Sequence, residues 1–144
     1  MSDFYVVGKS VPRVDALSKV TGEAAYTADV MLPGMLHGKV LRSPHAHARI
    51  VRIDTSRAEA LPGVRAVITG REVPDILIGL RVEDMPLMAR ELVRFTGEKV
   101  AAVAAVDEET ALEAVNLIDV EYEELPALID VEEAMKEGSL LVHE

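Results

Sequence analysis

The chain has 144 residues, of which 49% are hydrophobic and none is cysteine, and its formal net charge is −10 at pH 7. This length suits one domain, and the lack of cysteine excludes disulfides, thiolate metal sites and iron–sulfur ligation within the chain. No apolar run approaches the roughly 20 residues that span a bilayer. The N-terminus also lacks the segments of a secretory signal peptide. We therefore expect a cytoplasmic protein without membrane contact.

The negative charge is concentrated near the C-terminus. Residues 1–106 carry 14 Lys and Arg against 12 Asp and Glu, whereas residues 107–144 carry one Lys against 13 Asp and Glu. Such a region repels phosphates, so nucleic acid is not an expected partner. We interpret it as a solvated face that aids solubility. The alternative is a face that docks a basic partner protein.

Residues 1–34 are expected to form an irregular, extended arm with at most short strands. Glycines and prolines interrupt any periodic pattern there, at Gly8, Pro12, Gly22, Pro33 and Gly34. An arm of this kind is stable only when it lies against another surface. Residues 35–144 are assigned to a single α+β domain of mixed strands and about two main helices.

The first half of this domain reads mainly as strands, at residues 35–42, 48–54 and 64–69. Pro44 separates the first two strands because proline cannot donate a ladder hydrogen bond. A short helix is expected between Thr55 and Pro62.

Two further features are expected before residue 90. In the third strand, Val64, Ala66 and Ile68 alternate and are predicted to share one face. Residues 70–90 then read as a long loop, and loops of this length inside a compact domain are often functional or face a partner.

The last third gives the clearest pattern. Residues 100–106 are apolar throughout, as in a strand that is buried on both faces. Asp107 is a candidate N-cap for the helix that follows. One face of that helix is predicted to carry the apolar residues Ala111, Leu112, Ala114, Val115 and Ile118. A strand at residues 119–124 and a short helix at 131–136 complete the chain.

The only pattern that suggests a chemical site is the pair His45 and His47. In an extended segment both rings would project from the same face, which suits binding of one metal ion. A site needs at least three ligands, however, and the neighbouring Arg42 and Arg49 disfavour a cation. The favoured interpretation is that both histidines hold a bend after Pro44. They remain weak metal candidates, and no other metal ligand is assigned.

Other catalytic patterns are missing from the sequence. Ser43 lies close to His45 but has no Gly-x-Ser-x-Gly elbow, and no phosphate-binding glycine motif is present. Glu121 and Glu123 alternate with apolar residues and are expected on the solvent face. No catalytic or cofactor-binding residue is therefore assigned.

Several short motifs occur in an order that resembles a known family. They are Arg13-Val14-Asp15, Lys19-Val20-Thr21-Gly22, Pro33-Gly34-Met35-Leu36, Ser43-Pro44-His45-Ala46-His47-Ala48, Leu61-Pro62-Gly63-Val64, Gly97-Glu98 and Val120-Glu121-Tyr122-Glu123-Glu124-Leu125-Pro126. Together they resemble the start of the molybdenum hydroxylase large subunit, the family of xanthine dehydrogenase, aldehyde oxidase and carbon monoxide dehydrogenase. The resemblance implies the α/β hammerhead domain of that subunit.

In this family the molybdopterin ligands and the catalytic glutamate come from regions downstream of the hammerhead. The resemblance therefore implies that this chain holds no cofactor and is inert when isolated, although the parent enzyme hydroxylates an aldehyde, a purine-like heterocycle or a similar small substrate. The implied partners are the rest of the same subunit and the iron–sulfur and FAD subunits. If Met1 is native, separate iron–sulfur and flavin subunits are expected, as in bacterial members.

Two alternatives to this domain role stay open. One is a free-standing interaction module that uses its acidic face, and the other is a small metal-binding protein that uses His45 and His47. Some self-association of the isolated chain is also expected, because a domain without its neighbours exposes apolar surface.

Overall fold

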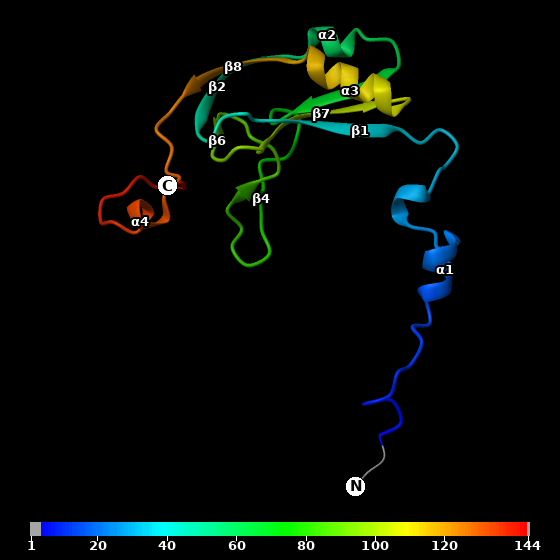
Figure 1. Ribbon diagram of the computed structural model, residues 1–144. Helices are drawn as coiled ribbons and strands as arrows, with labels where there is room; N and C mark the ends of the chain where they lie inside the picture. Colours follow the sequence, from blue (N-terminus) through cyan, green and yellow to red (C-terminus); the bar gives the residue numbers. More distant parts are fainter. Residues whose placement is uncertain (1–3, 144) are drawn as a thin grey trace. The chain divides into compact units, whose positions relative to one another are not determined.

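The computed structural model describes residues 4–143. Contacts divide the chain into two units, residues 1–33 and 34–144 (Figure 1). In the first unit, the described elements are helix α1 (Ala16–Thr21) and the 3-10 turn η1 (Thr27–Asp29). No helix within residues 4–143 is long and apolar enough to cross a membrane.

Helix α1 contradicts the expectation that the arm holds at most short strands. Asp15 precedes the helix, and its carboxylate lies 2.5 Å from both Arg13 Nε and Lys19 Nζ. The hydrogen bonds from Arg13 and then from Lys19 hold the pKa of Asp15 below its usual value. Gly22 ends the helix with a φ of 79°, which glycine adopts without strain. The run between Asp15 and Gly22 contains no helix breaker, so a six-residue helix forms there.

In the second unit, the first sheet has the order β1–β7–β3 and is antiparallel throughout. It consists of β1 (His37–Arg42), β7 (Lys99–Ala105) and β3 (Val64–Thr69). Strand β7 lies in the centre of this sheet, between β1 and β3. Four of its residues are buried, namely Val100, Ala101, Val103 and Ala105. The predicted strand is thus confirmed, although Ala102 and Ala104 are only partly buried and Val106, which follows the strand, is 41% exposed.

The second sheet has the order β6–β2–β8 and is also antiparallel. It consists of β6 (Leu92–Val93), β2 (Ala48–Asp54) and β8 (Asp119–Glu124). Strands β1 and β2 therefore belong to different sheets, and the Ser43-Pro44 interruption lies at the point where the chain passes from one to the other. Strand β6 was not expected, since two residues are too few to show a period.

Helix α3 (Glu108–Leu117) joins β7 of the first sheet to β8 of the second. Its N-cap is Asp107, as predicted, and the Asp107 carboxylate accepts a 2.7 Å hydrogen bond from the Thr110 backbone N–H. The hydrogen bonds from Thr110 lower the pKa of Asp107. Within residues 4–143, α3 is the longest helix, with 10 residues.

The main core lies between α3 and the β1–β7–β3 sheet, with the short helix α2 (Ser56–Glu59) beside α3 (Figure 1). Half of the buried side chains in this core are alanines. The buried members are Ala58, Ala101, Val103, Ala114, Val115 and Ile118. Leu112 is wrongly predicted to join them, because its side chain is 52% exposed.

A smaller core lies behind the second sheet. Its buried residues are Ala48, Ala89, Val93 and Val100. Ile53 and Val120 pack against both clusters, so the two cores are continuous across β2 and β8.

The predicted face of β3 is wrong. Pairing with β7 shifts register between Val64 and Ala66, which marks a bulge. A bulge breaks the two-residue alternation of a strand. Val64 and Val67 consequently pack against the core, while Ile68 is 38% exposed.

Residues 70–90 are not wholly loop. They contain a small hairpin of β4 (Leu77–Ile78) and β5 (Met85–Pro86). Gly79 lies in its turn, where an added Cβ would meet the Val82 carbonyl oxygen at 1.7 Å. Near the C-terminus, Asp130 is the N-cap of α4 (Val131–Ala134), and its carboxylate accepts hydrogen bonds from two backbone N–H groups. The mixed strands and helices confirm the α+β class.

Candidate functional site

The bend that carries the two histidines is fixed by backbone hydrogen bonds at Ser43. The Ser43 N–H donates to the Glu98 carbonyl at 2.9 Å, and the Gly97 N–H donates to the Ser43 carbonyl at 2.8 Å. The buried Ser43 hydroxyl also accepts the His45 N–H at 3.0 Å. Pro44 supplies no N–H, so the chain turns here, and residues 44–47 form a bend and not an extended strand.

His45 contacts two side chains of β8. Its Nδ1 lies 3.1 Å from Glu124 Oε1, and its ring centroid lies 4.8 Å from that of Tyr122 at an angle of 57°. Burial raises the pKa of Tyr122, and a hydrogen bond with the Ser43 side chain opposes that rise. His45 therefore links the bend to the β8 side chains.

His47 contacts the backbone that follows β8. Its Nδ1 lies 2.7 Å from the Pro126 carbonyl oxygen. Because a carbonyl oxygen can only accept, this His47 nitrogen carries the proton. The Leu125 N–H also donates to the His47 carbonyl at 3.0 Å. The backbone bond extends the β2–β8 pairing by one residue on each strand, and the side-chain bond joins the bend to Pro126.

The two histidines thus turn to different partners. No group of three or more His, Asp and Glu suited to a metal ion occurs within residues 4–143. The flanking arginines are engaged as well, Arg42 with the Gly97 carbonyl at 2.8 Å and Arg49 with Glu123 at 3.1 Å. The geometry favours a bend held by side chains over a metal centre.

A buried carboxylate, which the sequence did not indicate, lies behind the bend. Glu98 is 2% exposed, and its Oε2 accepts the Arg94 N–H at 2.5 Å. Its Oε1 is buried and has no hydrogen-bond partner within the described residues. The only signal in the sequence was the Gly97-Glu98 motif, and two residues do not indicate that Glu98 is buried.

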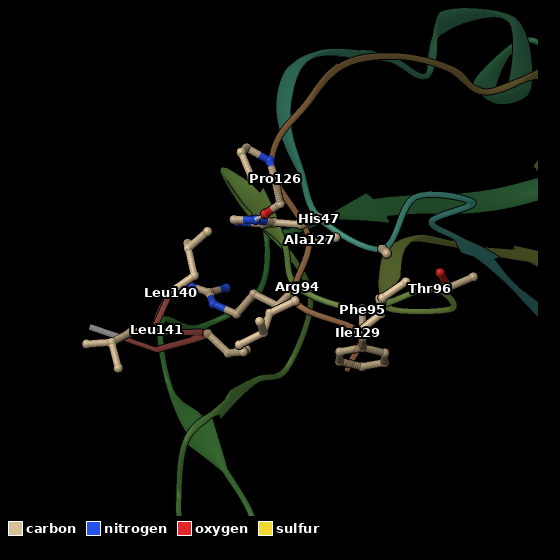
Figure 2. A pocket seen from close by; sticks show the side chains of 12 residues that line it. His47, Arg94, Phe95, Thr96, Pro126, Ala127, Ile129, Leu140 and Leu141 are labelled. Atoms are coloured by element: carbon tan, nitrogen blue, oxygen red, sulfur yellow. Dashed lines mark hydrogen bonds between the residues drawn. The ribbon is translucent and has the colours of Figure 1, made fainter. Parts of the chain in front are cut away.

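A cavity of about 190 Å³ opens beside His47 (Figure 2). Four segments line it, residues 46–47, 94–96, 126–129 and 140–142. Most of the lining side chains are apolar, and none is Asp or Glu. Sequence reasoning missed this cavity because its walls come from segments that are distant in the chain.

Within residues 4–143 the domain is thus a mixed α+β unit with two three-stranded antiparallel sheets, a two-stranded hairpin and the capped helix α3. The chain belongs to the family described as aldehyde oxidase and xanthine dehydrogenase, a/b hammerhead domain, whose model matches residues 21–126. The suspected membership is therefore confirmed.

Relatives and solved structures agree with this assignment. The chain is 44% identical over 133 residues to a probable xanthine dehydrogenase subunit of Bacillus subtilis, covering 92% of the chain and 18% of the relative. It is 39% identical to the nicotinate dehydrogenase large molybdopterin subunit of Eubacterium barkeri, covering 98% of the chain and 33% of that subunit. The reconstituted CO dehydrogenase from Oligotropha carboxidovorans superposes with a TM-score of 0.85 at 41% identity, covering 92% and 17% of the two chains.

The family implies a molybdopterin cofactor, but the residues of this chain do not fit one. The cavity is smaller than the roughly 300–1,000 Å³ of sites for drug-sized ligands. Its walls are largely apolar, whereas a pterin with a phosphate needs several converging donors. The chain spans only 18% of the length of the Bacillus relative.

Proposed function

We propose that the chain acts as the packing domain of a molybdenum hydroxylase large subunit and supplies no catalytic group. The observation that carries the proposal is the match of 92% of this chain to 17% of a much longer CO dehydrogenase chain. The buried core uses small apolar residues, and its buried carboxylate, Glu98, belongs to no metal-binding group within residues 4–143. In this role the domain braces the part of the subunit that binds molybdopterin.

The proposal extends to the parent enzyme. The subunit would bind molybdopterin outside this chain. It would assemble with iron–sulfur and FAD subunits in the cytoplasm. Its reaction would be oxidative hydroxylation of an aldehyde, a purine-like heterocycle or a similar small molecule. The relatives support this class of enzyme, since one is the large molybdopterin subunit of a nicotinate dehydrogenase and another is a probable xanthine dehydrogenase subunit. The isolated chain would be inert.

The arm supports a packing role because it leaves its apolar side chains uncovered. Val14 is 102% exposed, Leu17 70% and Val20 80%, and helix α1 has no buried residue. Exposed apolar surface of this kind marks contact with another protein surface. We propose that the arm lies on the rest of the large subunit.

Co-purification tests this role. The tagged chain is co-expressed with the Bacillus subtilis relative from which the matching 133 residues have been removed. We expect the two pieces to purify together, because each would cover apolar surface that the other leaves exposed. Replacing Val14, Leu17 and Val20 with Asp should weaken this association.

A matched control introduces Asp at exposed apolar positions outside the arm. Leu80 and Val82 lie in the β4–β5 hairpin and are 105% and 66% exposed. Their replacement with Asp should leave co-purification intact if the arm is the contact. Failure of the unaltered pieces to associate would contradict the packing role.

A further inference from the structure

Arg94 differs from the other arginines of the described chain. It is half-buried, whereas every other arginine within residues 4–143 is exposed. Its side chain lines the cavity beside His47, and no ion pair or hydrogen bond of its guanidinium occurs among the described residues (Figure 2). A partly desolvated cation without a partner is unfavourable, so this position favours an incoming anion.

The surroundings of Arg94 define what kind of anion fits. The cavity walls include the apolar side chains of Leu128, Ile129 and Leu140, and no wall residue is acidic. His47 has its Nδ1 bonded to the Pro126 carbonyl, so the ring is fixed at the cavity edge. Arg94 is the only Lys, Arg, Asp or Glu among the residues that line the cavity, although residues 107–144 as a whole are strongly acidic.

Size limits the ligand further. The cavity holds about 190 Å³, and an apolar protein cavity of about 150 Å³ is large enough to take benzene. A ring of that size with a short carboxylate arm would fill the space, whereas a nucleotide or a pterin is too large to fit. An apolar group supplies contact with the walls, and a carboxylate supplies the partner that Arg94 lacks.

We propose that this cavity binds a small amphipathic carboxylate, whose apolar group packs against Leu128 and Leu140 and whose carboxylate pairs with Arg94. The guanidinium donates two parallel hydrogen bonds to such a group, which lysine cannot reproduce. This site is independent of the packing role of the domain.

The test is an NMR titration of the ¹⁵N-labelled 144-residue chain with phenylacetate. Amide signals of residues 94–96 and 126–129 should shift in a saturable manner, because these residues line the cavity. The neutral analogue 2-phenylethanol has the same ring and a similar arm. It should bind about tenfold more weakly or worse, since it cannot form the charged pair.

Variants distinguish the contribution of the Arg94 charge to binding from that of the apolar cavity walls. Arg94→Gln should weaken phenylacetate binding about tenfold and leave 2-phenylethanol binding unchanged, while Arg94→Lys should retain part of the preference. The control Arg65→Gln removes an exposed arginine of β3 that does not line the cavity and should change neither. Equal binding of the acid and the alcohol, an unaffected Arg94→Gln chain or no saturable shift would each overturn the proposal.

Discussion

Val100 and Val14 are the same residue type in opposite environments. Val100 lies in β7 and is 0% exposed, whereas Val14 precedes α1 in the arm and is 102% exposed. Strand β7 has two paired neighbours and a helix packed against its sheet. Helix α1 is a short element with no buried residue. An apolar residue type therefore does not by itself determine whether a side chain is buried. The number of helices and strands packed around the side chain determines it.

The same substitution at both positions gives the largest expected contrast. Val100→Ala removes about two buried methylene equivalents, worth roughly 0.8 kcal/mol each, and leaves a cavity, so unfolding should become easier by about 2–3 kcal/mol. Val14→Ala should change the free energy of unfolding by less than about 0.5 kcal/mol. Urea denaturation followed by circular dichroism measures both. Equal losses would show that the arm is part of the cooperative core.

A glycine pair sharpens the contrast within the folded domain. At Gly70 an added Cβ would lie 2.4 Å from the Ala89 carbonyl oxygen, and backbone must shift to admit it. Gly70→Ala should therefore destabilise the chain by about 1–3 kcal/mol. Gly38 in β1 has its nearest atom at 3.9 Å, so Gly38→Ala should be neutral or stabilise by up to about 1 kcal/mol. Thermal unfolding of both variants would test this, and a loss at Gly38 as large as at Gly70 would refute it.

A smaller effect is expected from pH at the start of α3. Hydrogen bonds from Thr110 lower the folded-state pKa of Asp107. Its carboxylate therefore stabilises the folded chain above the unfolded pKa of about 3.9, and this contribution is lost as pH falls through the lower folded value.

Asp107→Asn isolates that contribution, because asparagine also caps helices but does not titrate. The stability advantage of the unaltered chain over Asp107→Asn should shrink as pH is lowered from about 5 to about 3. Chemical denaturation at several pH values measures the difference. A difference that stays constant over this range would contradict the role of the charged cap.

The sequence predicted those elements whose period is long enough to be distinctive. The apolar run of β7, the Asp107 N-cap of α3 and the alternation of β8 were all visible in the sequence and are confirmed. The two-residue strands β4, β5 and β6 carry no period. The bulge after Val64 was equally hidden, because it depends on pairing with β7.

The site was less predictable because its contacts join distant parts of the chain. His45 meets Glu124 and His47 meets Pro126, a separation of 79 residues in each case that local spacing cannot reveal. The burial of Glu98 and the lack of an ion pair at Arg94 within the described residues likewise depend on tertiary packing and not on residue type.

The molybdenum and pterin content of the purified chain tests its assignment as a packing domain most directly. The chain is produced in a host that makes molybdopterin, separated by gel filtration, and analysed for metal and for pterin fluorescence. A domain that supplies only packing should carry neither in stoichiometric amount. One molybdenum or one pterin retained per chain would contradict that assignment.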